Sequence, residues 1–325
     1  MSEKQAKNTG PHGRIAAAGA REHFAARLFD GLWDRYRERV SYVRDYENVI
    51  AKHGATFVND HIAFRTFAIQ NPLTGIASIS RIFEALGYEP AGCYQFPDKH
   101  LSAIHFQHPN AEFPKLFISE LRVWELSAKA EEIIASLLSS HRDPISLGVL
   151  SKLSNLRGAD STAALDDVQF EQVLNEFHAR PWGLPNKAEL ETINKESQYA
   201  AWVLVHGYNV NHFTSLINSH GVGELDDIEK TVAALKAAGV PMKDEIEGQA
   251  GSKLRQTATA AVEIDVPILD AGEETTTRWS YAYFELAQRG EVNDPETDQP
   301  RRFEGFLGPQ ATQLFEMTRR SSSAQ

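Results

Sequence analysis

Two short apolar runs, each with a single histidine, stand out in the pattern of hydrophobic and polar positions. They cover residues 58–65 and 208–214. Each is followed by a helical pattern, a Gly/Pro break, further strand-like runs and finally a strand that carries a glutamate. We therefore interpret the chain as two copies of a βαβββ unit, each of which begins on a histidine strand.

The first unit begins with a strand at residues 61–67. Apolar residues at helical spacing then predict a helix that ends at Gly87, with Pro90 just beyond; they are Ile76, Ile79, Phe83 and Leu86. Three more strands are expected, around residues 92–96, 101–107 and 115–121. The last of these carries Glu120.

The second unit opens with the run 202–216, which Gly207 breaks into more than one element. Asp226 or Asp227 is a suitable N-cap for the helix that follows. That helix presents Ile228, Val232 and Leu235 on one face and ends at Gly239. Strands are predicted at 256–266 and 278–286, the latter carrying Glu285, and residues 273–277 are expected to form a polar loop.

The remaining segments complete an α+β fold in which two βαβββ modules form a half-open barrel around a metal site. We expect a disordered tail at residues 1–20 and a single catalytic domain at 21–325, with an N-terminal helical region at about 20–52. Within the domain we predict module one at about 55–125, a helical insertion at 126–200 and module two at 201–290. A closing segment with a terminal helix is expected at about 300–320.

Composition narrows the class of protein. The net charge of -11 disfavours nucleic acid as a partner, because phosphate binding needs a basic face. The lone Cys93 cannot form an intramolecular disulfide. No apolar run approaches 18 residues, and the N-terminus lacks the apolar segment of a secretory signal. We expect a cytoplasmic protein without membrane association, and composition leaves its oligomeric state open.

The candidate chemistry is a metal site made by two histidines and one carboxylate on neighbouring strands. Such a facial triad leaves coordination positions open, as non-haem Fe(II) oxygenases require, although Zn, Mn and Ni accept the same donors. We assign His61, His212 and Glu285 as ligands. Glu120 is a fourth candidate, as a ligand, as an acceptor for a histidine N–H or, the interpretation we favour, as a surface charge.

Arg65 lies four residues after His61, so on a strand both side chains share one face. Its guanidinium fits either a substrate carboxylate or an internal ion pair, and spacing alone does not choose between them. Arg255, with Lys253 and Gln256, could also reach a substrate carboxylate, although a solvated charge is the interpretation that we favour.

The motifs at residues 60–67, 206–208, 211–214 and 283–285 together resemble the 2-oxoadipate dioxygenase/decarboxylase (hydroxyglutarate synthase) family, over residues 22 to about 318. The resemblance implies a vicinal-oxygen-chelate fold and Fe(II) held by His61, His212 and Glu285. It also implies that Arg65 binds the substrate, and that 2-oxoadipate and O₂ become 2-hydroxyglutarate and CO₂ in lysine catabolism.

The resemblance also places residues 306–311 where the C-terminal part closes over the substrate. Pro309 and Gln310, together with His61 and Arg255, are therefore the candidate substrate contacts besides Arg65. Two alternatives stay open: a glyoxalase-like Zn or Ni isomerase or lyase completed by Glu120, and a non-catalytic small-molecule binding protein on the same fold.

Overall fold

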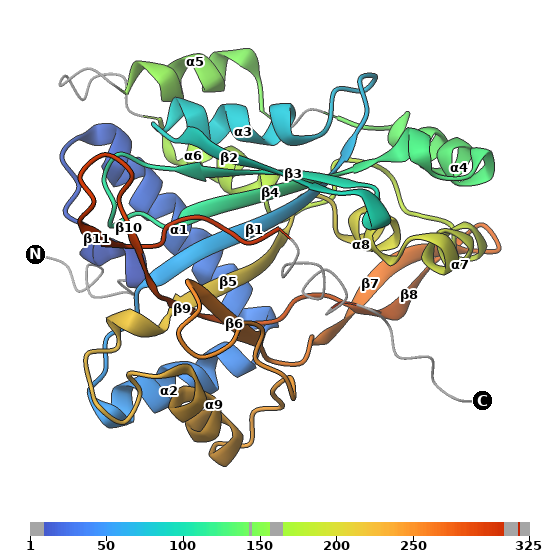
Figure 1. The fold of residues 1–325 in the computed structure, drawn as a ribbon. Helices are drawn as coiled ribbons and strands as arrows, with labels where there is room; N and C mark the ends of the chain where they lie inside the picture. The colour runs from blue at the N-terminus through green and yellow to red at the C-terminus, as the bar shows by residue number, and fades with distance from the viewer. Residues whose placement is uncertain (1–9, 143–144, 157–164, 309–317, 319–325) are drawn as a thin grey trace, which may run out of the picture.

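The computed structural model describes residues 10–142, 145–156, 165–308 and 318. A seven-stranded mixed sheet curls through its centre in the order β2-β3-β4-β1-β5-β9-β6 (Figure 1). The strands of this sheet are β1 (Asn59–Ala68), β2 (Glu89–Phe96), β3 (Leu101–Gln107), β4 (Lys115–Arg122), β5 (Val210–Leu216), β6 (Leu254–Ala258) and β9 (Glu285–Arg289).

Helices surround this sheet, and two small hairpin sheets accompany it. The helices are α1 (Ala20–Arg39), α2 (Tyr42–His53), α3 (Ile76–Ala85), α4 (Ala128–Leu138), α5 (Leu147–Asn155), α6 (Asp167–Glu176), α7 (Lys187–Glu196), α8 (Gln198–His206) and α9 (Ile228–Ala237). The hairpins pair β7 (Glu263–Asp270) with β8 (Glu273–Ser280), and β10 (Glu291–Asn293) with β11 (Pro300–Arg302). None of the helices in the described ranges is long and apolar enough to cross a membrane.

The central sheet has an approximate two-fold pattern. The first strands of the two modules, β1 and β5, pair antiparallel in the middle. Their last strands, β4 and β9, lie parallel to β1 and β5 respectively, and β3 and β6 then pair antiparallel with those last strands. The predicted pair of modules forming a half-open barrel is therefore confirmed.

The second module departs from the predicted boundaries in three places. The run 202–216 contains the end of helix α8 before β5, because its first half is apolar on every side and fits a buried helix as well as a strand. The single strand expected at 256–266 is divided between β6 and β7. Residues 273–277, expected as a loop, belong to β8, which pairs with β7 along its whole length.

Part of the segment expected as a disordered tail is folded against the domain. Pro11–Arg14 forms a 3-10 turn that buries His12. The His12 ring is 2.9 Å from Asp30 Oδ1 and 3.0 Å from the side-chain amide of Asn59, so it ties the segment to α1 and β1. Polar composition alone did not reveal these partners. The terminal helix expected within 311–319 lies outside the described residues except for Thr318.

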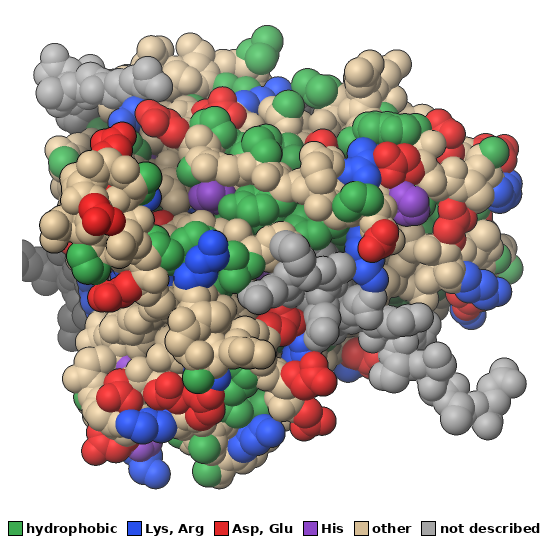
Figure 2. All heavy atoms as spheres, in the orientation of Figure 1, with side chains coloured by type: hydrophobic (Ala, Val, Ile, Leu, Met, Phe, Trp, Pro, Cys, Tyr) green, Lys and Arg blue, Asp and Glu red, His purple; other side chains and the backbone are tan. Residues whose placement is uncertain are grey.

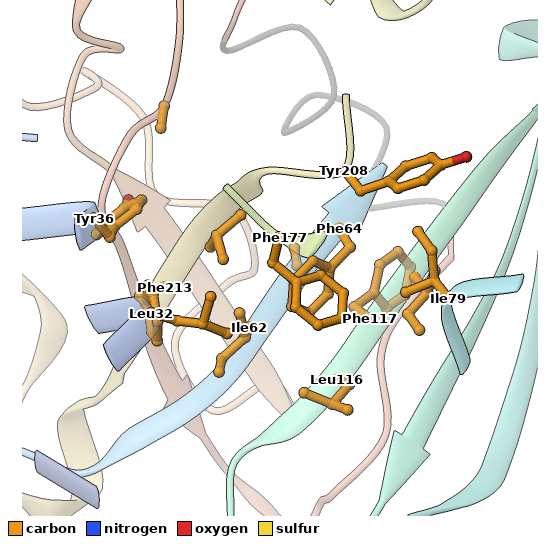
Figure 3. Close-up of a cluster of buried hydrophobic side chains, with 14 of the residues drawn as sticks. Leu32, Tyr36, Ile62, Phe64, Ile79, Leu116, Phe117, Phe177, Tyr208 and Phe213 are labelled. Atoms are coloured by element: carbon orange, nitrogen blue, oxygen red, sulfur yellow. The ribbon is translucent and has the colours of Figure 1, made fainter. Parts of the chain in front are cut away.

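Strand alternation separates the core from the site. Ile62 and Phe213 pair across β1 and β5 and face α1, where Leu32 and Tyr36 meet them (Figure 3). The Tyr36 and Phe213 rings lie 5.0 Å apart between centroids. On the face of the molecule drawn in Figure 2, described acidic and basic side chains are interspersed, in keeping with a chain of mixed charge.

Candidate metal centre

Three buried side chains from three adjacent strands meet on the other face of the sheet. His61 comes from β1, His212 from β5 and Glu285 from the first position of β9. The two Nε2 atoms are 3.4 Å apart, and the Glu285 carboxylate oxygens lie 3.5 Å from His61 Nε2 and 3.4 Å from His212 Nε2. The predicted triad is therefore brought together, with its donor atoms all within 4.8 Å of one another.

Each histidine of the triad directly follows a β-bulge. The β1–β5 pairing skips Asp60 between the pairs Asn59–Ser215 and His61–Thr214. It skips Asn211 between the pairs Ala63–His212 and Phe64–Val210. A bulge residue has no opposite partner and bends its strand, so its side chain can turn toward its neighbour instead of alternating away. The two bulges are equivalent positions of the two modules.

The bulge residues supply the acceptors for the outer ring nitrogens of the histidines. Asp60 Oδ2 is 2.7 Å from His61 Nδ1, and Asn211 Oδ1 is 3.0 Å from His212 Nδ1. An acceptor at Nδ1 fixes the tautomer that leaves Nε2 free to bind a metal. We did not predict these two residues from the sequence; the available signal was the Asp-His and Asn-His dipeptides at matching places in the two modules.

Asp60 is in turn held by a buried arginine. Arg289 Nε and Nη2 donate to Asp60 Oδ1 and Oδ2 at 2.5 and 2.7 Å, and its Nη1 donates to the carbonyls of Phe303 and Gly305. Burial alone would raise the pKa of Asp60, but Arg289 and Lys115 outweigh burial and hold the pKa well below its usual range. Asp60 is therefore a charged acceptor, whereas Asn211 is a neutral one.

The donor set fits a divalent cation. Burial raises the pKa of Glu285 well above its ordinary value and lowers the pKa of His212 well below its own. Gln256 Nε2 donates to Glu285 Oε1 at 2.6 Å, while Oε2, which is buried, has no hydrogen-bond partner among the described residues. A cation at this point would satisfy that oxygen and restore the carboxylate charge.

The register shows why the first module adds no fourth donor. Glu285 lies opposite Thr214, two residues after His212. The equivalent position on β4 lies opposite Ala63, two residues after His61, and it is occupied by the apolar Phe117.

Glu120 lies three residues beyond this position and is partly buried. Its Oε2 accepts from the backbone N–H of Ile76 at 2.8 Å, at the start of α3. Glu120 therefore binds the N-terminus of α3 and lies apart from the His61–His212–Glu285 cluster. The structure supports neither the metal-ligand role nor the surface-charge interpretation considered for it.

Arg65 is buried too, and its side chain lines one cavity together with the triad. Its Nη1 donates to Thr318 Oγ1 at 2.8 Å, and its guanidinium lies 5.1 Å from the centroid of the Tyr199 ring and 5.2 Å from that of Trp202. Burial lowers the pKa of Arg65, and Tyr283 and Tyr199 oppose that shift. The predicted shared face of His61 and Arg65 is present, because both side chains line one cavity.

The cavity between the triad and Arg65 has a volume of about 30 Å³. Its polar lining includes Gln256 and Asn211, and its apolar lining includes Phe117 and Phe306. The Phe306 ring meets the His61 ring edge-on at 4.9 Å between centroids. Phe306 and Gln256 thus belong to the site as much as the predicted residues do.

Arg255 lies outside this cavity, which corrects its predicted place. Because strand side chains alternate, Gln256 points to Glu285 and its neighbour Arg255 points to α9. There Arg255 forms a two-pronged ion pair with Glu229 and lies 3.9 Å from Asp227. The candidate contacts Pro309 and Gln310 lie outside the described residues.

Two tyrosines and one further histidine near the triad have different surroundings. Tyr283 stacks on His212 with centroids 4.8 Å apart and lines the cavity, whereas Tyr281 packs on Trp202. His206 is the last residue of helix α8 and contacts the carbonyl of Ser280, so it shares no strand with His212. Tyr283 alone of these three reaches the metal cluster.

The paired modules and the two-histidine, one-carboxylate cluster define a protein of the glyoxalase-like class with a candidate metal centre. Residues 28–300 match the family of 2-oxoadipate dioxygenase/decarboxylase. The chain belongs to that family.

Relatives and solved structures agree with this membership. The chain is 29% identical over 280 residues to the chloroplastic 2-oxoadipate dioxygenase/decarboxylase of Arabidopsis thaliana, which covers 80% of this chain and 67% of the relative. A glyoxalase superfamily protein of Ralstonia eutropha JMP134 is similar with a TM-score of 0.77 and 26% identity, over 89% of this chain and 87% of that one.

The hydroxyglutarate synthase of Oryza sativa, solved in complex with 2-oxoadipate, shares the fold with a TM-score of 0.73. It is 24% identical, over 94% of this chain and 95% of that one.

Proposed function

We propose that this protein is an Fe(II)-dependent dioxygenase that converts 2-oxoadipate and O₂ to 2-hydroxyglutarate and CO₂. The observation that carries the proposal is the set of three buried donors, His61, His212 and Glu285, with Phe117 where a fourth donor would lie. Three protein ligands leave positions for both a chelating 2-oxo acid and oxygen. Family membership supports the reaction type and the substrate.

His61, His212 and Glu285 would hold the iron, which supplies a centre for chelating the 2-oxo acid and activating oxygen. Asp60 and Asn211 keep the two rings in the tautomer that presents Nε2. Gln256 fixes one carboxylate oxygen of Glu285 and leaves the other directed at the histidines. The chain therefore prepares the donor geometry before metal binding.

Arg65 would bind the distal carboxylate of the substrate at the opposite end of the cavity. A buried guanidinium recognises a carboxylate strongly, because their planar geometries match and the local dielectric is low. The apolar rings of Phe117 and Phe306 exclude water from the space between. Since that space is only about 30 Å³, enough for about two water molecules, side chains such as Phe306 must move when substrate enters.

The four-ligand isomerase is the weaker alternative. It needs a donor from the first module, and the equivalent position holds Phe117 while Glu120 binds the backbone of α3. A role in lysine catabolism and a cytoplasmic location remain predictions.

Oxygen uptake tests the proposal directly. Protein reconstituted anaerobically with Fe(II) is given 2-oxoadipate, and in a parallel run 2-oxoglutarate, while O₂, CO₂ and 2-hydroxyglutarate are measured. We expect one O₂ consumed and one CO₂ released for each 2-hydroxyglutarate formed from 2-oxoadipate. The His212→Ala variant, checked for folding by circular dichroism, should show none of these. Turnover of the acid without oxygen uptake, or iron-loaded protein inert toward both acids, would reject the proposal.

A further inference from the structure

A second hollow lies beside the last turn of α8. It has a volume of about 380 Å³ and is lined by the end of α1, the loop before α7, the end of α8 and strand β7. Figure 1 shows α8 and β7 at the same end of the molecule. Val205, Ile264, Val266 and Pro267 give it apolar walls.

Two arginines in this hollow have no acidic partner in the described part of the chain. Arg180 donates to the carbonyls of Trp182 and Val205, and among the described residues its Nη2 has no partner. Arg39 donates to His178 Nε2 at 2.9 Å and lies 5.5 Å from the centroid of the Tyr281 ring. In the described part of the chain neither guanidinium lies within 4 Å of a carboxylate, an unusual state in a protein of net charge -11.

The neighbouring groups in the described lining do not offset the positive charge of Arg39 and Arg180. Burial, with the two arginines adding to it, lowers the pKa of His206 to about 3, so its ring is neutral. Burial alone lowers the pKa of Arg180 to about 10, which still leaves it charged at neutral pH. Asp265, the one acidic residue in the described lining, is exposed and lies 3.9 Å from Arg278.

A polar atom in the same wall has no partner. Asn209 is buried, its amide nitrogen donates to the carbonyl of His206, and its Oδ1 is unpaired among the described residues. An unpaired buried acceptor is costly and usually marks a site for a water or a ligand donor. The hollow thus offers two cationic donors and one acceptor over an apolar floor.

We propose that this hollow binds a small organic anion, a carboxylate or phosphate that also carries a hydroxyl group, at a site separate from the metal centre. Arg39 and Arg180 bind the anionic group, and Asn209 Oδ1 accepts from the hydroxyl. Trp202 contacts both sites, since its ring lies 4.9 Å from that of His206 and 5.2 Å from the Arg65 guanidinium. The site does not depend on the proposed reaction.

Calorimetric titration of the iron-loaded protein, kept anaerobic, tests the proposal with malate and glycerol 3-phosphate as probes. Succinate and methyl phosphate, which lack the hydroxyl, are their matched comparisons. We expect saturable binding of at least one hydroxylated probe, weakened about tenfold in Arg39→Gln and in Arg180→Gln through loss of a charged hydrogen bond. The two variants are made singly, so that one remains informative if the other impairs folding.

Two controls locate the binding. Arg44→Gln removes an exposed arginine of α2 and should leave affinity within twofold of the parent. Arg65→Ala should also retain binding, because Arg65 lines the cavity at the metal centre and does not line this hollow. Binding that disappears in Arg65→Ala but survives in both pocket variants would overturn the proposal. So would the absence of saturable binding by either hydroxylated probe, or equal affinity for the probes with and without a hydroxyl.

Discussion

At the residue scale, the two acceptors behind the ligand histidines differ in charge although they occupy equivalent bulges. Asp60 is charged and clamped by Arg289, whereas Asn211 is neutral. Removing Asp60 would leave a buried arginine without its partner, a loss that costs about 3–5 kcal/mol of stability. Substitution of Asn211, which leaves no buried charge unpaired, is therefore the better test of how the orientation of a histidine ring contributes to metal affinity.

We expect Asn211→Ala to lower Fe(II) affinity about 10- to 100-fold, because His212 loses the acceptor that fixes its tautomer. Anaerobic metal titration measures this affinity, and urea unfolding shows whether the fold is retained. Asn293→Ala, at an exposed strand position, serves as the control. An unchanged metal affinity in a folded Asn211→Ala protein would remove the positioning role.

Arg65→Ala should raise KM for 2-oxoadipate about 100-fold, because a two-pronged charged contact to the substrate carboxylate is lost. Steady-state oxygen uptake measures it. Arg255→Ala is a suitable control, since Arg255 pairs with Glu229 outside the cavity and should leave KM within twofold. A KM that moves equally in both variants would contradict the anchor role of Arg65.

At the element scale, α3 begins without a side-chain cap of its own. Its N-cap is Gly75, and the acceptor for Ile76 N–H comes from Glu120 on β4. Glu120→Ala should therefore lower the free energy of unfolding by about 1 kcal/mol, the usual cost of a lost N-cap acceptor. Urea unfolding measures it, and kcat for oxygen uptake should stay within twofold. A collapse of kcat with unchanged stability would return Glu120 to the metal centre.

The elements also show how far the sequence could be interpreted. Histidine strands, helix ends at Gly87 and Gly239 and the final glutamate strands follow from local periodicity and punctuation, so both modules and the triad were predictable. The bulges at Asp60 and Asn211 were not, because they exist only in the pairing of two strands some 150 residues apart. The break at Gly207 was predicted, but the run before it was not assigned to a helix, because a fully buried apolar run has no periodicity to distinguish helix from strand.

The sequence did not predict which side chains of the second module face the cavity, for a related reason. The β7–β8 hairpin interrupts the chain between β6 and β9, so parity counted through residues 278–286 does not follow one strand. Alternation along the strand expected at 278–286 would place both Tyr281 and Tyr283 on the face of Glu285, but only Tyr283 lines the cavity. Arg255 and Gln256 were both considered for the substrate, and only their register on β6 shows that Gln256 is the one that faces the cavity.

At the scale of the whole molecule, buried neutral histidines make stability depend on pH. The pKa of His206 is about 3 in the folded protein and about 6.5 when unfolded. As pH falls below about 6.5, the unfolded chain therefore binds a proton that the folded protein refuses. The contribution to stability is complete above that pH and is lost progressively down to about pH 3, by up to about 1.4 kcal/mol per pH unit.

Urea unfolding of the metal-free protein at pH 7.5, 6.0 and 5.0 measures this dependence. The free energy of unfolding should fall with pH, and His206→Gln, which keeps a donor for the Ser280 carbonyl, should fall less steeply. Comparing the two proteins removes the contribution of the other histidines. An equal pH dependence of the unfolding free energy in the parent and in His206→Gln would contradict this prediction. It would mean that His206 has the same pKa in the folded and unfolded protein.

The placement of the triad across the junction of β1 and β5 has a consequence for how the protein is made. His61 and His212 are 151 residues apart, and Glu285 emerges later still. A growing chain therefore cannot assemble the triad until Glu285 has left the ribosome. An ion held by the triad would join β1 to β5 and β9, so metal retention would report that the two modules have come together.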